Sequence, residues 1–266
     1  MQSIIDAISE DSFGKKRITF FKKNKLIECW IEKKNSPSKI TEIHLAKIIQ
    51  IVKPIKRVFY ELFNGSQASA RYKVDPPNIG ELEIITIIAE QRDGKPAHAQ
   101  RGFFLKSKFA IILNKYNFLG ISKKIINENE REKLINLASK TKLKNAGAII
   151  RSLADGISKE VLEKDFLEIV ELWKRSQERM NDIEPNIIFE GHDLQKQAEY
   201  SFPKIKNIQD KCSCEFNKRN GLGQILEAYN SIFSIKNGGT LYFEITKALT
   251  PIDIDSSKRD LNKGGL

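Results

Sequence analysis

The chain has 266 residues, 40% hydrophobic and 30% charged, a balance that fits one large or a few small globular domains and excludes a largely disordered protein. The formal net charge of +11 predicts partners with phosphate backbones or anionic surfaces, unless the many lysines only keep the protein in solution. No apolar run approaches a membrane span, and no basic segment precedes an apolar one at the N-terminus, so we expect a soluble cytoplasmic protein.

Three cysteines, Cys29, Cys212 and Cys214, are too few for a disulfide framework and fit a reducing compartment. Cys212 and Cys214 could form half of a metal clip, but the sequence offers no second ligand pair at a suitable spacing. We therefore expect no zinc site.

The first forty residues predict few elements. Residues 1–15 have the pattern of a short helix or an arm. Two strands are expected between Arg17 and Glu32, because apolar residues alternate on both sides of a Lys-Asn-Lys turn. The polar segment Lys33–Lys39 predicts a linker.

Several strand-like runs then follow in quick succession. Asn-Gly, Pro-Pro and Asp-Gly-Lys-Pro turns separate them, which predicts a small barrel of OB type. The run 84–88 is almost continuously apolar, as in a strand buried on both faces. The expected strands are Ile43–Val52, Arg57–Leu62, Glu81–Ile88 and Phe103–Leu113.

Helical patterns appear after about residue 114. A helix is expected over Asn127–Ser139, followed by a buried strand over Gly147–Ile150. Ser158 is expected to cap a long amphipathic helix that ends near Met180, and its apolar stripe predicts core packing, not a cofactor site. The stripe consists of Leu162, Phe166, Ile169, Val170 and Trp173.

The later part of the chain predicts a strand over Asn186–Glu190, no clear element over 191–222, and a helix over Gly223–Phe233. Two terminal strands follow, and the second carries Asp253 and Asp255. Alternate residues of a strand share a face, so both carboxylates can point the same way. Paired carboxylate oxygens suit a hard cation such as Mg²⁺. The alternative is that Asp253 is a solvated loop carboxylate that holds no metal.

Five blocks in this order resemble the ribonuclease E/G family of bacterial endoribonucleases. The resemblance implies magnesium-dependent cleavage of single-stranded RNA that carries a 5′-monophosphate, in RNA processing and decay. The blocks are Leu45–Pro54 with Val58-Phe59-Tyr60-Glu61, Asp93-Gly94-Lys95 with Leu105 and Phe109–Leu113, Gly120-Ile121-Ser122-Lys123-Lys124, Ile149-Ile150-Arg151-Ser152 with Gly156, and Gly238-Gly239 through Asp253.

The resemblance implies a mixed α+β fold, in which an OB-type barrel is inserted in an RNase H-like α/β scaffold. An α/β 5′-sensor region and the first strands of the catalytic domain are expected to follow. The expected divisions are 1–36 for the N-terminal scaffold strands, 37–113 for the barrel, 114–200 for the sensor, 201–236 for the return to the scaffold, and 237–266 for the catalytic start.

By the resemblance, Arg151 and Ser152 bind the RNA 5′-phosphate together with Gly120 and Lys123. A guanidinium fork and a hydroxyl make a good phosphate pocket. Lys123 and Lys124 stand where the family has two arginines, so the charge is kept and the fork geometry is lost. The alternative is that Arg151 is an ordinary arginine at a strand end.

RNA binding by the barrel is implied for Phe59, which would stack on a base, and for Lys95, which would contact the RNA backbone. Outside the barrel, Lys124 is also implied to bind RNA. The alternative places Phe59 in the core. The family's second aromatic is replaced by Gln67-Ala68-Ser69, so we expect a weaker grip on RNA.

Asp253 is implied to be catalytic and to hold magnesium, with Asp255 where the family usually has asparagine. Lys247 replaces a glutamate, and the partner aspartate lies in a later strand of the family's catalytic domain, so this chain alone is expected to turn over slowly or not at all. The cysteine-rich zinc link that joins subunits is not found, which leaves an oligomer open. The alternatives are a non-catalytic RNA-binding protein and a lysine-rich or ribosome-associated protein without a defined substrate.

Overall fold

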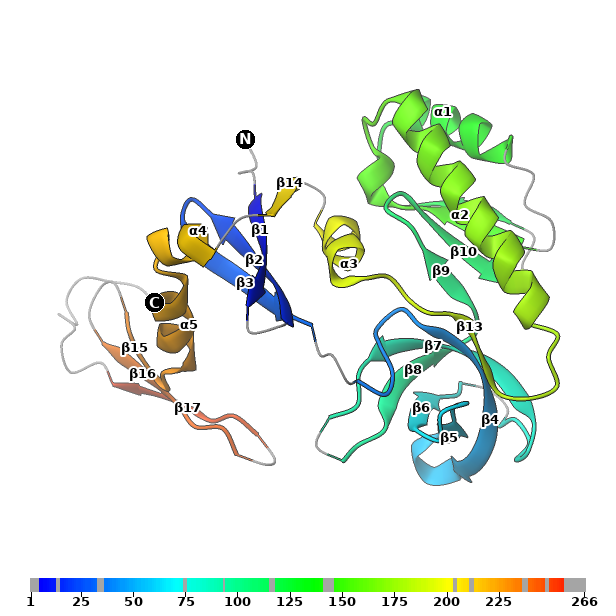
Figure 1. Ribbon diagram of the computed structural model, residues 1–266, viewed down its shortest axis with the longest axis horizontal. Helices are drawn as coiled ribbons and strands as arrows, with labels where there is room; N and C mark the ends of the chain where they lie inside the picture. The colour runs from blue at the N-terminus through cyan, green and yellow to red at the C-terminus, as the bar shows by residue number, and fades with distance from the viewer. Residues whose placement is uncertain are drawn as a thin grey trace. The chain divides into compact units, whose positions relative to one another are not determined.

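A computed structural model describes residues 5–12, 15–32, 36–73, 76–92, 94–114, 118–140, 146–202, 205–210, 213–235, 239–246 and 249–255. The chain divides into two compact units (Figure 1): unit 1 contains residues 1–30 and 206–266, and unit 2 contains residues 31–205. Both units contain helices as well as strands, so the predicted mixed α+β class is confirmed.

Unit 2 contains a closed five-stranded barrel. Its order is β4-β5-β6-β8-β7, and β7 pairs back onto β4. Every neighbouring pair is antiparallel except β6 and β8, and this connectivity is consistent with the predicted OB-type barrel. The strands are β4 (Ile43–Val52), β5 (Arg57–Glu61), β6 (Gln67–Arg71), β7 (Leu82–Ala89) and β8 (Ala97–Arg101), and the short helix η1 (Lys53–Ile55) links the first two.

The interior of the barrel combines one large side chain with several small ones. Tyr60 is fully buried, and its hydroxyl donates to Oε2 of Glu83 over 2.8 Å. Nε of Arg101 donates to the other oxygen of the same carboxylate over 2.7 Å. Burial, followed by the negative charge of Glu83, raises the pKa of Tyr60, so the phenol stays protonated as a donor. Five alanines share this core: Ala46, Ala68, Ala70, Ala97 and Ala99.

The run Phe103–Leu113 does not form the predicted barrel strand. It breaks at Ser107 into β9 (Phe104–Lys106) and β10 (Ala110–Asn114), which pair with each other in a separate sheet. The barrel is closed by β8, which lies earlier in the chain.

The separate sheet has the order β11-β12-β10-β9, where β11 is Leu119–Ile121 and β12 is Ala146–Ile150. Only β11 and β12 run parallel. The helices α1 (Glu128–Ser139) and α2 (Lys159–Arg179) share a buried core with this sheet (Figure 1). All five residues of the predicted stripe of α2 are buried, which confirms that it is core.

A local cap stabilises α1, and an aromatic contact with a distant residue anchors α2. The side chain of Asn127 accepts from the backbone nitrogen of Glu130 and caps α1. Trp173 of α2 meets the ring of Phe103 edge to face, with centroids 5.0 Å apart. The short helix η2 (Ser152–Ala154) follows β12, β13 (Asn186–Phe189) pairs with β4, and α3 (Leu194–Ser201) follows β13. None of the helices in the described part of the chain has the length and apolarity needed to cross a membrane.

Unit 1 contains two sheets. One has the order β14-β1-β2-β3, in which β1 and β2 are antiparallel, and the other has the order β15-β16-β17 and is antiparallel. The positive φ angles of Lys23 and Asn24 confirm the predicted turn between β2 and β3. The elements are β1 (Ile5–Ser12), β2 (Lys15–Lys22), β3 (Lys25–Ile31), β14 (Ile205–Asp210), α4 (Ser213–Lys218), α5 (Gly221–Tyr229), β15 (Ile232–Ser234), β16 (Thr240–Phe243) and β17 (Ile252–Asp255).

Two further predictions about the elements of the chain are wrong. Residues 1–15 were expected to form a short helix or an arm, but they contain β1, which pairs with β2 from Asp6 to Ser12. Residues 191–222 were expected to hold no clear element, but they contain α3, β14 and α4. Asp93, Cys212, Gly238 and Lys247 lie outside the described residues.

Candidate nucleic-acid interface

The outer face of the barrel presents Phe59. In β5 the neighbours Val58 and Tyr60 are buried in the barrel core, whereas Phe59 is only partly buried. Successive side chains of a strand point to opposite faces, so Phe59 lies outside the barrel and not in its core. Its ring is therefore available on the face that OB-type barrels use for oligonucleotides, which is the face of their second and third strands.

Polar and basic residues surround Phe59 on the same face. Phe59 pairs with Gln50 on one side and with Ser69 on the other, and Ser69 pairs with the exposed His98. Nη1 of Arg57 donates to Oγ of Ser69 over 2.8 Å. An aromatic ring on the same barrel face as guanidinium and imidazole groups matches a surface that stacks bases and contacts phosphates.

Sequence reasoning missed Arg57 and His98. The available signal was the alternation within each strand, since both residues share the outward phase of Phe59 and Ser69. Lys95 was predicted, and it lies exposed in the loop between β7 and β8, where its backbone nitrogen donates to the carbonyl of Arg92. Loops at this place in OB-type barrels take part in ligand binding.

The guanidinium of Arg151 at the end of β12 is bonded to backbone carbonyls. Nη1 donates to the carbonyls of Ser107 and Lys108 over 2.7 and 2.8 Å, and Nη2 donates to the carbonyl of Tyr200 over 2.7 Å. These bonds use three of the five N–H groups of arginine. Among the described residues, Nε and one hydrogen of Nη2 remain for a ligand.

The turn between β9 and β10 is held from its other side by Asp165 of α2. This carboxylate accepts from Oγ of Ser107 over 2.6 Å and from the backbone nitrogens of Lys108 and Phe109 over 3.3 and 3.2 Å. Burial raises the pKa of Asp165, and its three donors oppose that shift. This role could not be predicted from the sequence, because Asp165 lies among the polar residues of an amphipathic helix.

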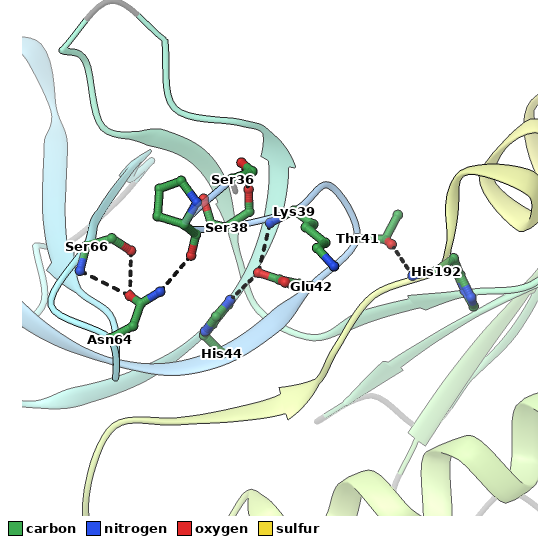
Figure 2. A network of polar contacts seen from close by, with 10 residues as sticks. Ser36, Ser38, Lys39, Thr41, Glu42, His44, Asn64, Ser66 and His192 are labelled. Carbon is green, nitrogen blue, oxygen red and sulfur yellow. Dashed lines mark hydrogen bonds and ion pairs between the residues drawn. The ribbon is translucent and has the colours of Figure 1, made fainter. Parts of the chain in front are cut away.

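His192 connects the same region to the barrel. Its Nε2 lies 2.6 Å from the carbonyl of Lys106 and must carry the proton, because a carbonyl only accepts. Its backbone nitrogen donates to Oγ1 of Thr41 over 2.9 Å, across the gap between the loop before β4 and the segment after β13 (Figure 2). Burial lowers the pKa of His192, so the neutral ring is favoured in the folded protein.

Backbone conformation, close packing and hydrogen bonds all restrict the junction at Thr41. Thr41 has a φ of 75°, a left-handed value that is unusual for a β-branched residue. Gly191 also has a positive φ, and a Cβ there would lie 3.2 Å from both the backbone nitrogen of Glu42 and Oγ1 of Thr41. Glu42 accepts from Nε2 of the buried His44 and from the backbone nitrogen of Lys39, which fixes the loop on the barrel (Figure 2).

Burial shifts the pKa values of several groups beside Arg151 in the direction that favours their neutral forms. It lowers the pKa of Lys106 and of Arg151 itself, and it raises the pKa of Tyr200 to about 12. Clusters of such shifts are enriched at functional sites, although structural ion-pair networks also produce them.

The predicted residues Gly120, Lys123 and Lys124 come together with Arg151 through backbone pairing. Gly120 pairs with Ile149 across the parallel strands β11 and β12, and the backbone nitrogen of Ser122 donates to the carbonyl of Ile150. The two strands thus end side by side, and Lys123 and Lys124 are exposed just beyond. The carboxyl ends of parallel strands are a common place for ligands.

Two further details refine this group. Arg131 of α1 donates through Nη1 to the carbonyls of Ser122 and Ile125, so it holds the turn that carries the two lysines. Gly120 has a packing reason to be glycine, since a Cβ would lie 3.2 Å from the ring of Phe118. Ser152 is half-buried at the start of η2, directly after Arg151.

Asp253 and Asp255 lie on β17 in unit 1. They pair with Tyr242 and Thr240 of β16, and they share one face of the strand as predicted. Oδ1 of Asp253 accepts from the backbone nitrogen of Ile254 over 2.9 Å. Magnesium commonly takes one or two protein carboxylates and completes its shell with water and substrate phosphates, so this pair fits that ion. Within the described residues, no cluster of three or more His, Cys, Asp or Glu side chains could hold a metal.

Comparison with known proteins points to one family. Residues 105–209, which include Arg151, Asp165 and His192, match the model of the Ribonuclease E/G family. Ribonuclease G of Haemophilus influenzae is 26% identical over 208 residues, which cover 66% of this chain and 42% of that protein. Ribonuclease G of Escherichia coli K12 is 21% identical over 209 residues, with the same coverage, and that of Salmonella typhimurium is 25% identical over 100 residues, which cover 38% of this chain and 20% of that protein.

The aligned part of the chain thus spans about two fifths of the length of the H. influenzae and E. coli relatives. The order of motifs and these matches agree, so the resemblance predicted from the motifs is confirmed. Over the matched residues, the chain is similar to proteins of the ribonuclease E/G family.

Proposed function

We propose that the chain is an endoribonuclease of the ribonuclease E/G type that binds single-stranded RNA and cleaves it with magnesium. The observation that carries the proposal is the outer barrel face, where Phe59 lies outside the core beside the Arg57–Ser69 hydrogen bond. The names of the similar proteins support the same activity class. Processing and decay of RNA in the cytoplasm is the corresponding role.

In this proposal Phe59 stacks on an unpaired base, and Arg57 and Lys95 contact the phosphate backbone of the RNA on either side of that base. Arg151, Ser152, Gly120 and Lys123 surround the 5′-terminal phosphate, and Lys124 contacts the RNA beyond it. Arg151 acts there through its remaining N–H groups, while its other bonds keep the neighbouring turn in place.

Asp253 and Asp255 would hold Mg²⁺ through their carboxylate oxygens. When bound, the ion supplies an activated water and stabilises charge on the phosphate oxygens during attack. We further propose that segments 1–36 and 201–236 form the RNase H-like scaffold, a view supported by the pairing of β14 with β1 in one sheet.

A non-catalytic RNA-binding protein is the second candidate. The observation that favours it is that, among the described residues, no third His, Cys, Asp or Glu side chain joins Asp253 and Asp255 in a group that could hold a metal. Both candidates use the same barrel and phosphate residues, so they differ only in whether bound RNA is cut.

Cleavage separates the two candidates. A labelled single-stranded RNA with a 5′-monophosphate is incubated with the chain, with and without Mg²⁺, and the products are sized. An endoribonuclease gives internal cuts that need magnesium, and tight binding without cuts supports the RNA-binding candidate.

Asp253→Asn is expected to weaken binding of a divalent cation by about tenfold, because an amide contributes one neutral oxygen in place of a charged carboxylate. Titration with Mn²⁺, followed by its paramagnetic signal, measures this change, and any magnesium-dependent cutting should disappear with it. Asp11→Asn, an exposed carboxylate of β1, is the matched control. Unchanged Mn²⁺ affinity in Asp253→Asn would place the metal elsewhere.

A further inference from the structure

The turn between β9 and β10 forms an anion-binding nest that is filled by a side chain of the protein. Its donors are Oγ of Ser107 and the consecutive backbone nitrogens of Lys108 and Phe109. Consecutive N–H groups in a turn form concavities that bind phosphate and other anions. Here the anion is the carboxylate of Asp165, with both oxygens engaged.

The shape of the nest depends on Arg151 as well as on Asp165. Nη1 of Arg151 binds the carbonyls of Ser107 and Lys108, which are the opposite side of the same turn. The N–H side therefore faces Asp165 even if that carboxylate leaves. A nest that is held open from behind can accept another anion.

The surroundings of Asp165 are mixed in charge. Arg151 lies close enough to interact electrostatically with Asp165, and Glu168 of the same helix adds a like charge. Tyr200 of α3 faces Arg151 and Asp165, and Lys106 of β9 lies beside Arg151. Burial disfavours the ionised Asp165, as its raised pKa indicates, so the resident carboxylate is not held with the full strength of its three hydrogen bonds.

We propose that Asp165 is an internal competitor for phosphate: its carboxylate occupies the Ser107–Phe109 nest, and a terminal phosphate of RNA must displace it to bind beside Arg151. The proposal rests on the proposed function and names the residue that sets the strength of 5′-phosphate recognition. A terminal phosphate can compete because it carries more than one negative charge and three acceptor oxygens, whereas a carboxylate carries one charge and two.

Asp165→Asn tests the proposal. The amide keeps the shape and one acceptor oxygen for the turn, but removes the charge that repels an incoming anion. Affinity for inorganic phosphate, measured by calorimetry on the whole chain, is expected to rise about tenfold or more, because a like charge leaves direct contact with the bound anion. Preference for 5′-monophosphate over 5′-hydroxyl RNA should rise as well.

Glu168→Gln is the matched control. It removes the same charge from the same helix at an exposed position, without changing any bond in the nest. Its phosphate affinity should change much less than that of Asp165→Asn. Equal gains in both variants, or no gain in Asp165→Asn, would overturn the proposal.

A pH profile of sulfate binding, measured on the unmodified chain and on His192→Gln, covers the case in which Asp165→Asn does not fold. Sulfate keeps its two charges over the pH range in which a carboxyl group with a raised pKa titrates, so its binding reports on the protein groups alone. Neutralising Asp165, whose pKa is raised, should strengthen sulfate binding as the pH falls. His192, whose pKa is lowered, faces the same region and also becomes protonated as the pH falls. The increase in sulfate affinity is assigned to Asp165 only if it persists in His192→Gln, which lacks the imidazole. A flat profile in His192→Gln would contradict the competitor role.

The measurement of phosphate affinity and the measurement of the preference for 5′-monophosphate RNA can fail independently. A gain in phosphate affinity with no preference for 5′-monophosphate RNA in any protein supports the competitor role and rejects the proposed RNA function. A 5′-monophosphate preference in the unmodified chain, with unchanged phosphate affinity in Asp165→Asn, supports the RNA function and rejects the competitor role.

Discussion

Replacing Arg151 by alanine is expected to lower the free energy of unfolding by about 2–4 kcal/mol, since hydrogen bonds to a charged donor contribute about 1.5–3 kcal/mol each and are not additive. The loss arises because three carbonyls, those of Ser107, Lys108 and Tyr200, lose their guanidinium donor together. Urea denaturation measures it as a lower midpoint at an unchanged slope.

Arg175→Ala is the control for this variant, because Arg175 is exposed on α2. Its free energy of unfolding should change by no more than about 0.5 kcal/mol. A loss of similar size in both variants, or a fully stable Arg151→Ala, would show that the carbonyl bonds are unimportant. RNA binding by Arg151→Ala is informative only where the variant is folded, and there its preference for a 5′-monophosphate should be lost.

Phe59→Ala is expected to weaken binding of single-stranded RNA about tenfold or more, because stacking of a base on an aromatic ring contributes about 1–3 kcal/mol. Stability should change little, since Phe59 lies outside the barrel core. Fluorescence anisotropy with a labelled single strand, combined with urea denaturation, measures the two effects independently.

Tyr229→Ala is the aromatic control, since Tyr229 of α5 is 85% exposed and belongs to unit 1. Its RNA affinity should stay within about twofold of the unmodified chain, because the substitution removes an exposed aromatic ring that is not part of the barrel. If Phe59→Ala binds RNA as tightly as Tyr229→Ala does, the outer barrel face is not the RNA-binding surface.

Elements with a strong apolar period could be predicted from the sequence. The stripe of α2, the buried strand β12 and the turn at Lys23-Asn24 each have a local signal that tertiary packing reinforces. The two barrel strands β6 and β8 had no such signal. Their inward residues are alanines, which have low strand propensity but fit the crowded interior of a small barrel around Tyr60.

The N-terminal strand β1 was missed for a different reason. Its buried side includes Glu10, whose carboxylate forms an ion pair with Arg17 of β2. A charged residue in a strand suggests exposure unless its partner is known, and the partner lies across the hairpin. The pattern of one segment therefore could not reveal the strand.

The candidate site was predicted in part. Arg151, Ser152, Gly120 and Lys123 do come together, because β11 and β12 pair in parallel and end at the same edge. The bonds of Arg151 to the β9–β10 turn, and those of Asp165 to the same turn, join residues more than forty positions apart. Contacts of that range depend on the packing of α2 against the sheet, which no local pattern specifies.

One measurement tests the central claim, that the barrel face recognises unpaired RNA. The affinity of the chain is compared for one RNA sequence as a labelled single strand and as a duplex, at several salt concentrations. We expect the single strand to bind about tenfold more tightly or better at every salt concentration, because only unpaired bases can stack on Phe59. Equal or tighter binding of the duplex, lost steeply as salt rises, would contradict the claim and indicate a basic surface without a reading site.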